Sequence, residues 1–366
     1  MRRICLSLLC LLTGLSAPAQ TTKRQTRNVI FVMTDGLRRQ ELFGGAEEAL
    51  ITPKNTGSLT EVERLKDLYV KPTPQARREA LMPFVWSVIA KNGQIYGNRD
   101  LGSESFVTNG RNFSYPGYSE ILCGFPDPRI DSNAKIPNAN VTVLEWLHKK
   151  PAFQRKIAAF GAWDVFPFII NAERAGFPVN AGHEPLTAGK FTPAIAQLNR
   201  LKAEVPQIWE SEAFDALTFH SALEYLKQNK PRVMFLSLGE TDEWGHAGNY
   251  KLYLAAARRV DDYLKTLWET LQSMSEYRGK TSLIFAVDHG RGDGPDDWRN
   301  HGEKVPDSKW NWMAFLGPDT PALGERSNVP PVTQSQVAAT LASLLGEDYV
   351  ADVPKAGAPI KDVLPR

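Results

Sequence analysis

The feature that most constrains this chain is an apolar stretch that runs directly into a cluster of potential metal ligands. Residues 283–287 have the composition of a buried strand. The polar segment that follows contains Asp288, His289 and, further on, His301, which are a carboxylate and two of the six histidines of the chain. In open α/β sheets, ligands bind outside the carboxyl ends of strands. We therefore interpret this segment as part of a metal or catalytic site rather than as a solvated turn with incidental histidines.

Two further apolar stretches end in the same way. Residues 28–33 lead to Asp35, and residues 233–238 lead to an acidic segment that contains Asp242. Helical patterns separate these strands, and the longest of them, over 249–273, has apolar residues spaced for one buried face. Apolar strands that alternate with helices predict an α/β fold with a largely parallel sheet covered on both faces.

The first residues of the chain are typical of an export signal. Arg2 and Arg3 precede an apolar run and then a small residue on either side of Pro18, which predicts a signal peptide over 1–19 and a protein that is periplasmic or secreted. We expect residues 20–366 to form a single domain. A charged, proline-containing insertion is expected near 45–75, with a surface helix inside it.

Charge and hydropathy exclude some partners. The chain has 43 Lys and Arg against 41 Asp and Glu, and the two arginines of the signal peptide account for the difference. This balance gives no reason to expect nucleic acid or an anionic membrane as a partner. No apolar run outside the signal peptide is long enough for a membrane anchor. Cys123 is the only cysteine beyond the signal peptide, so no intrachain disulfide is expected.

The three strand ends together offer six potential ligands for metal ions. Aspartates and histidines in this mixture suit zinc, or another borderline divalent ion, better than magnesium or calcium, which prefer oxygen ligands. The simplest interpretation is that two metal ions share the six side chains. The side chains are Asp35, Asp242, His246, Asp288, His289 and His301.

Ser114 is the candidate nucleophile. Pro116 suits the first turn of a helix, so Ser114 is expected at or just before a helix N-terminus. Such a position favours a bound anion, and we expect the adjacent backbone N–H groups to point toward it. Two nearby cations could activate the serine hydroxyl for attack. A serine that only caps the helix fits the same position equally well.

The order of these motifs resembles that of the alkaline phosphatase superfamily, which includes nucleotide pyrophosphatase/phosphodiesterases and sulfatases. The resemblance spans residues 28–302 and implies a mixed, mainly parallel sheet between layers of helices. The motifs that carry it are Asp35-Gly36, Ser114-Tyr115-Pro116, Asp242 with His246, Asp288-His289-Gly290, and His301-Gly302.

The resemblance also implies roles for the site residues. Ser114 would be the nucleophile that becomes transiently phosphorylated, in an exported two-metal hydrolase of small phosphate esters. Zinc is the expected metal. The implied ligand sets are Asp242, His246 and His301 for one ion and Asp35, Asp288 and His289 for the other.

The substrate class is less constrained. Arg291 and Asn112 are candidate substrate-binding residues, with Arg291 equally suited to a surface ion pair, and either a monoester or a diester fits. A sulfatase is the weaker branch, because it normally carries an arginine where this chain has Tyr118 and binds calcium through oxygen ligands. A metal-containing binding protein without catalysis is the alternative from another class. A phosphosugar mutase of the same superfamily fits poorly with a signal peptide.

Overall fold

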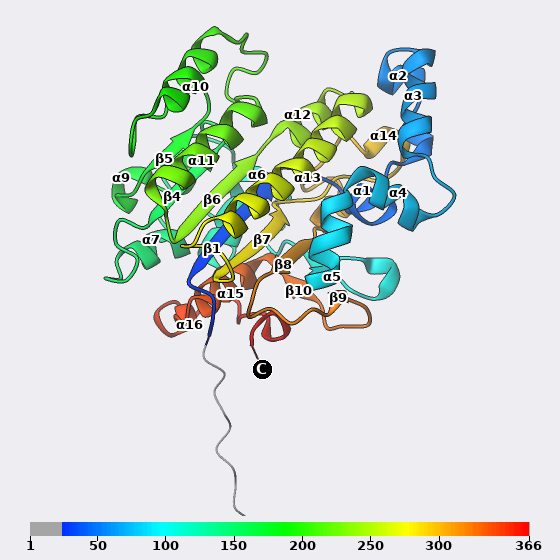
Figure 1. The fold of residues 1–366 in the computed structure, drawn as a ribbon. Coiled ribbons are helices and arrows are strands. Elements are labelled where there is room, and N and C mark those ends of the chain that lie inside the picture. Colours follow the sequence, from blue (N-terminus) through cyan, green and yellow to red (C-terminus); the bar gives the residue numbers. More distant parts are fainter. Residues whose placement is uncertain (1–23, 366) are drawn as a thin grey trace, which may run out of the picture.

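A large mixed sheet forms the centre of the molecule, with helices packed on both faces (Figure 1). The computed structural model describes residues 24–365, and the predicted signal peptide lies outside them. Strand β8 is antiparallel to its neighbours β7 and β2, and the other adjacent strands are parallel. The prediction of a mixed, mainly parallel sheet is therefore confirmed. From edge to edge the strands are β5 (Val179–Ala181), β4 (Ile157–Gly161), β6 (Val233–Leu238), β1 (Asn28–Thr34), β7 (Thr281–Val287), β8 (Met313–Leu316), β2 (Gly93–Tyr96) and β9 (Gly324–Glu325).

The position of strand β1 in the centre of the sheet explains why its sequence is apolar throughout. Ile30 and Val32 point into one hydrophobic cluster, whereas Phe31 and Met33 point into a second cluster on the opposite face. Successive side chains of a strand alternate between faces. Both faces are covered by helices, so no position of β1 is left for a solvent-facing polar side chain.

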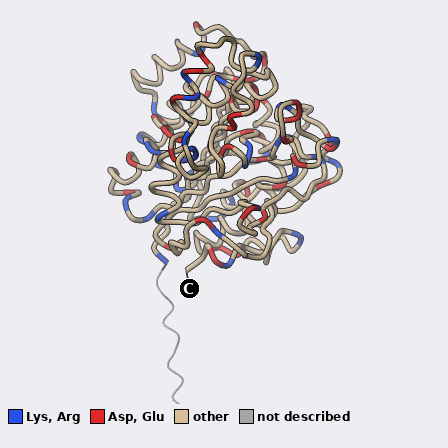
Figure 2. The backbone as a smooth tube through the Cα atoms, turned by 90° about the vertical axis from the view of Figure 1, so that its right-hand side faces the viewer, with Lys and Arg blue, Asp and Glu red and all other residues tan. Residues whose placement is uncertain are grey.

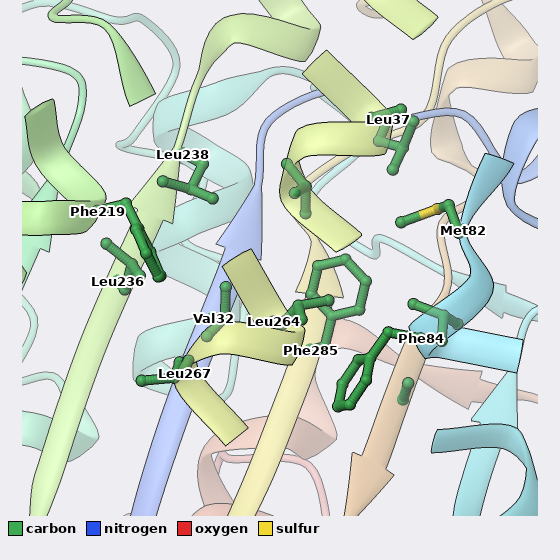
Figure 3. Packing of buried hydrophobic residues seen from close by; sticks show 14 of the residues in the cluster. Val32, Leu37, Met82, Phe84, Phe219, Leu236, Leu238, Leu264, Leu267 and Phe285 are labelled. Carbon is green, nitrogen blue, oxygen red and sulfur yellow. The ribbon is translucent and has the colours of Figure 1, made fainter. Parts of the chain in front are cut away.

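The first face is covered by α11 (Asp215–Asn229) and α13 (Tyr250–Ser273). Figure 3 shows Leu264 and Leu267 of α13 above Val32 and Phe285 of the sheet. The Asn249 side chain caps the start of α13 by accepting from the Leu252 backbone N–H at 3.1 Å. The long amphipathic helix predicted here is confirmed. It packs over the three strands whose ends carry the candidate ligands.

The second face is covered by helices that include α6, which begins with Ser114. The Thr142 side chain caps α7 by accepting from the Glu145 backbone N–H at 3.2 Å. This layer consists of α6 (Ser114–Cys123), α7 (Val143–His148), α8 (Phe166–Ile169), α15 (Val337–Leu344) and α16 (Tyr349–Asp352).

The segment between β1 and β2 forms a group of short helices beside the sheet (Figure 1). The surface helix expected within 45–75 is α3. Residues Val85–Ile89 form a π-helical turn that runs on into α5. The helices of this segment are α1 (Arg39–Gly44), α2 (Pro53–Thr56), α3 (Leu59–Tyr69), α4 (Pro74–Leu81) and α5 (Ala90–Asn92).

The remaining elements are short apart from α10. The region 163–190, to which the sequence pattern assigns no structure, contains α8, α9 and β5. Among residues 24–365, no helix is both long and apolar enough to cross a membrane. Figure 2 shows acidic and basic residues interspersed along the chain. The other elements are α9 (Ala172–Ala175), α10 (Pro193–Glu204), α12 (Glu240–His246), α14 (Gly294–Asp297), β3 (Ser105–Phe106) and β10 (Val332–Thr333).

Candidate metal centre

The register of the central sheet brings the candidate ligands to one edge. Strands β6, β1 and β7 are adjacent and parallel, so their carboxyl ends lie together. Asp35 follows β1, Asp288 follows β7, and Asp242 lies in α12, which begins just after β6. The potential ligands form two groups of three, and within each group the ligand atoms lie within 4.8 Å of one another.

The first set, which we call the inner group, consists of Asp35, Asp288 and His289 and is buried throughout. His289 Nε2 lies 3.3 Å from Asp35 Oδ1 and 3.4 Å from Asp288 Oδ2. Both of these carboxylate oxygens are buried and lack a hydrogen-bond partner. A buried, unpaired oxygen is costly unless something binds it. The three atoms therefore face a common point at which a cation would satisfy them.

The atoms of the inner group that face away from this point are hydrogen-bonded. His289 Nδ1 donates to the Gly290 carbonyl at 2.9 Å, which leaves the Nε2 lone pair free for a ligand. The Tyr118 hydroxyl donates to Asp35 Oδ2 at 3.0 Å and accepts from the Ser237 hydroxyl at 2.8 Å. The Gly36 backbone N–H donates to Asp288 Oδ1 at 3.1 Å. These bonds fix the orientation of all three potential ligands.

The outer group consists of Asp242, His246 and His301. His246 Nε2 lies 3.0 Å from Asp242 Oδ2 and 2.9 Å from His301 Nε2, so three potential ligand atoms converge. Asp242 and His246 lie one turn apart in α12, as their spacing predicts. His301 Nδ1 donates to the Asn112 carbonyl at 3.3 Å. The side chain of His246 is 49% exposed, so the outer group reaches solvent.

Arg291 has a different environment from the one expected of a residue that grips substrate. Its guanidinium is fully buried and pairs with the Asp242 carboxylate. It also donates to the Asp242 carbonyl at 2.8 Å and to the Arg299 carbonyl. Of the two roles expected for Arg291, the ion pair is the one present in the structure, and it is buried rather than on the surface. Substrate binding by Arg291 stays a prediction.

Burial shifts the pKa values of several potential ligands. Burial raises the pKa of Asp35 to about 8, and the charge of Asp242 adds to the shift. Burial also raises the pKa of Asp288 well above its usual range. Burial lowers the pKa of His289 to about 4 and that of His301 to about 2, so both imidazoles stay neutral, which is the form that binds a metal. The residues present therefore fit divalent cations.

Asp242 is held in its ionised form by its neighbours. Burial opposes ionisation of Asp242, but Arg291 and His246 outweigh it and hold the pKa of this carboxyl well below its usual range. The charge of Asp242 in turn raises the pKa of His246. The outer group thus keeps its single carboxylate ionised with help from the guanidinium.

Ser114 lies beside the inner group. It is the first residue of α6, and the N-cap is Phe113, with no side-chain capping bond. The interpretation of Ser114 as a capping residue is therefore wrong. Its Oγ lies 3.4 Å from His289 Nε2. A Cβ on Gly117 would lie 2.7 Å from the Asp288 carbonyl oxygen, so this glycine allows α6 to pack against the end of β7 and brings Ser114 to the ligands.

The start of α6 offers fewer free N–H groups than the sequence suggests. The Tyr115 N–H donates to Asn133 Oδ1 at 3.0 Å, and Pro116 has no N–H. The Tyr115 N–H is thus engaged, and anion binding by the other N–H groups near Ser114 stays a prediction. Asn133 instead brings a side-chain amide next to the nucleophile. Sequence reasoning missed it, because it lies in a loop without any local pattern.

Asn112 joins the nucleophile loop to the outer group through its backbone. It has a left-handed conformation, with φ of 54°. Its carbonyl accepts from the Gly302 N–H at 3.0 Å as well as from His301. Asn112 Oδ1 is buried without a hydrogen-bond partner. The backbone role was not predicted, and substrate binding by the side chain stays a prediction.

Comparison with solved structures shows which proteins share the fold. The fold is similar to that of wild-type alkaline phosphatase PafA, with 11% identity, 93% of this chain and 99% of that chain covered, and a TM-score of 0.58. It is also similar to lipoteichoic acid synthase LtaP from Listeria monocytogenes, with 10% identity, 89% and 73% covered, and a TM-score of 0.56. A third similar structure is BT1596, a 2-O GAG sulfatase, with 13% identity, 93% and 74% covered, and a TM-score of 0.55.

These similarities and the family match place the chain in the alkaline phosphatase superfamily, as the motifs predict. The family model described as "Type I phosphodiesterase / nucleotide pyrophosphatase" matches residues 85–343, which is more than half of the chain. The chain belongs to this family. None of the curated protein sequences compared with the chain matches it. Superfamily enzymes are hydrolases that use divalent metals, and the inner and outer groups are the candidate places for them here.

Proposed function

We infer that the protein is an exported two-metal hydrolase of phosphate esters, with Ser114 as the nucleophile and zinc as the metal. Diesters or pyrophosphates are the proposed substrates. The family match supports the reaction class. Export rests on the sequence of the first twenty residues, which precede the described part of the chain.

One observation carries the proposal. Asp35 Oδ1 and Asp288 Oδ2 are buried, unpaired and directed toward the same imidazole nitrogen, next to the hydroxyl of Ser114. Carboxylate oxygens and a neutral imidazole in this arrangement are the ligand set of a divalent cation. The outer group supplies a second ligand set near the same serine. Asn112, two residues before Ser114, accepts a hydrogen bond from His301 through its carbonyl.

The residues of the chain suit an in-line displacement through a phosphoserine. Two bound cations would stabilise negative charge on the attacking and leaving oxygens. Ser114 Oγ forms the bond to phosphorus while the bond from phosphorus to the leaving oxygen breaks. Water then cleaves the phosphoserine, which returns the serine hydroxyl and releases the product. The amide of Asn133, whose oxygen accepts from the Tyr115 N–H at the start of α6, would supply a donor for a phosphoryl oxygen.

The preference for diesters follows from where the nearby cations are engaged. Arg291 pairs with Asp242, Arg111 pairs with Glu303, and Lys135 lies 2.7 Å from Asp164. A phosphate monoester carries two negative charges and gains most from an unpaired cation, whereas a diester carries one. Because these three cations already have acidic partners, the site suits the singly charged substrate better.

The test is paired. Metal content of the purified protein is measured together with hydrolysis of p-nitrophenyl phosphate, bis-p-nitrophenyl phosphate and p-nitrophenyl sulfate. We expect about two zinc ions per chain and the fastest turnover with the diester. A preference for the monoester would overturn the substrate class, and preference for the sulfate would favour a sulfatase-like enzyme.

The same measurement separates the remaining alternative. A metal-containing binding protein of this fold would hold both ions and hydrolyse none of the three esters. The described structure speaks for the enzyme, because Ser114 and all six potential ligands are chemically competent and lie together. Absence of bound metal would overturn the two-metal proposal itself.

A further inference from the structure

We propose that Arg291 is a permanent cation of the outer group, which weakens metal binding there and makes the inner group fill first. This inference rests on the proposed two-metal site and extends it to an order of metal binding. Arg291 is then a positioning and charge-balancing residue rather than a substrate ligand. The outer metal would be the exchangeable one.

The contacts of Arg291 are directed at the outer group. Its guanidinium pairs with Asp242 Oδ1, while Asp242 Oδ2 is the oxygen that lies 3.0 Å from His246 Nε2. One oxygen of the only carboxylate in this group is therefore engaged by the guanidinium, and the other remains for a metal. A carboxylate that already pairs with a positive charge attracts a second cation less strongly.

Two glycines leave space in the fold for this guanidinium. A Cβ on Gly245 would lie 2.7 Å from Arg291 Cζ, and a Cβ on Gly36 would lie 2.9 Å from Arg291 Nε. The backbone of Gly36 has φ of +58°, which disfavours other residues there. Any side chain at either glycine would displace the guanidinium. The ion pair is therefore held by the surrounding backbone and is not a surface contact that solvent would loosen.

The two groups differ in charge because Arg291 is buried beside only one of them. The inner group has two carboxylates, and no lysine or arginine in the described part of the chain forms an ion pair with either of them. The outer group has one carboxylate, and Arg291 neutralises it. Two imidazoles add no charge when neutral. A divalent cation that binds in place of the protons thus meets two carboxylates in the inner group, but in the outer group only one, which is already paired with a guanidinium.

Arg291 also connects the outer group to the loop that carries His301. Its guanidinium donates to the carbonyl of Arg299, two residues before His301, and to the carbonyl of Asp242. If the role of Arg291 were purely structural, its loss would disorder the outer ligands and lower the affinity of the outer group for the metal. The electrostatic role predicts the opposite sign, so the two can be separated by measurement.

The experiment titrates the metal-free mature protein with Zn²⁺ against a chromogenic chelator. The wild type is expected to bind two ions whose affinities differ at least about tenfold. Arg291→Met, which keeps volume and loses charge, should raise the weaker affinity by at least about tenfold and leave the tighter one within about threefold. Arg291→Lys should stay near the wild type. The matched control is Arg111→Met, which removes a charge paired with Glu303 and should change neither affinity.

A second measurement, which does not use Arg291→Met, keeps the test decisive if that variant does not fold. Co²⁺ added in sub-stoichiometric amounts should give one absorption spectrum that Asp242→Asn leaves unchanged and Asp288→Asn abolishes, because it fills the inner group. Two equal affinities in the wild type, or weaker zinc binding in Arg291→Met, would overturn the inference while leaving the two-metal hydrolase intact. No zinc binding at all would instead overturn the proposed function.

Discussion

The inner and outer groups contain the same kinds of side chain but are built on different supports. The inner ligands follow the central strands β1 and β7 directly and are buried. The outer ligands lie on the short helix α12 and on a loop, and His246 is half exposed. Strand ends are fixed by sheet hydrogen bonds, whereas a helix turn and a loop depend on tertiary contacts such as that from Arg291. The support of a ligand thus separates a rigid site from an adjustable one.

The comparison also concerns charge. Burial raises the pKa of Asp35 to about 8, and burial together with the charge of Asp35 raises the pKa of Asp288 well above its usual range. A similar repulsion is absent from the outer group, where a guanidinium accompanies one carboxylate. The inner group therefore has the stronger need for a cation, and the predictions below test whether the two groups behave differently.

The largest effect is expected from the residue next to the inner group. Ser114→Ala removes the nucleophile and should reduce turnover at least about 10³-fold, as for other covalent catalysts. Ser114 forms no helix-capping bond, so stability should change little. Steady-state kinetics with the preferred p-nitrophenyl ester, together with zinc analysis, checks this. Two zinc ions should remain, and full activity would exclude Ser114 as the nucleophile.

Ligand substitutions in the two groups should have unequal consequences for stability. Asp288→Asn and Asp242→Asn should each leave one metal ion per chain. A tightly bound ion stabilises the folded state more than a weakly bound one. The rise in Tm on adding zinc should therefore survive in Asp242→Asn and be largely lost in Asp288→Asn. Thermal unfolding with and without zinc measures this, and equal losses in both variants would contradict the comparison.

The packing of α6 against β7 offers a test of the inner group without touching a ligand. Gly117→Ala places a methyl group 2.7 Å from the Asp288 carbonyl oxygen, so the helix must move and carry Ser114 with it. We expect a loss of about 1–3 kcal/mol in unfolding free energy and slower turnover. Denaturant unfolding and kinetics measure the two effects. Gly44→Ala is the matched control, because a Cβ there meets nothing within 4 Å.

Much of the fold and of the inner group could be predicted, for a physical reason. The apolar pattern of β1, β6 and β7 follows from burial on both faces, and parallel neighbours end at one edge. Carboxylates placed after such strands come together whatever the loops do. This reasoning brings Asp35, Asp242 and Asp288 together, and the structure does so. Their roles as metal ligands stay a prediction.

What could not be predicted depends on contacts between distant segments. Arg291 lies next to a ligand motif, but its pairing with Asp242 depends on space left by Gly36 and Gly245. Asn133 reaches the start of α6 from a loop with no periodic pattern. The π-helical turn at Val85–Ile89 likewise has no signal in its apolar sequence. Such features are set by tertiary packing, which a linear pattern does not encode.

The smallest effect is expected from removing a hydroxyl that contacts only the inner group. Tyr118 lies one helical turn after Ser114, and its hydroxyl donates to Asp35 Oδ2 at 3.0 Å. Tyr118→Phe leaves this oxygen and the Ser237 hydroxyl without their shared partner, so zinc affinity of the inner group should fall about 10- to 100-fold, as for other residues that orient metal ligands. Affinity of the outer group should not change.

The control for this change is Tyr349→Phe. Tyr349 is equally buried in the same hydrophobic cluster, but its hydroxyl donates to the Cys123 carbonyl and contacts no candidate ligand. Both variants lose the hydrogen bonds of one buried hydroxyl, so a similar fall in stability of about 1 kcal/mol is expected in each. Only Tyr118→Phe should shift the tighter of the two zinc affinities. If both variants shift it equally, the effect comes from general loosening of this face, and the hydrogen bond to Asp35 does not tune the inner group.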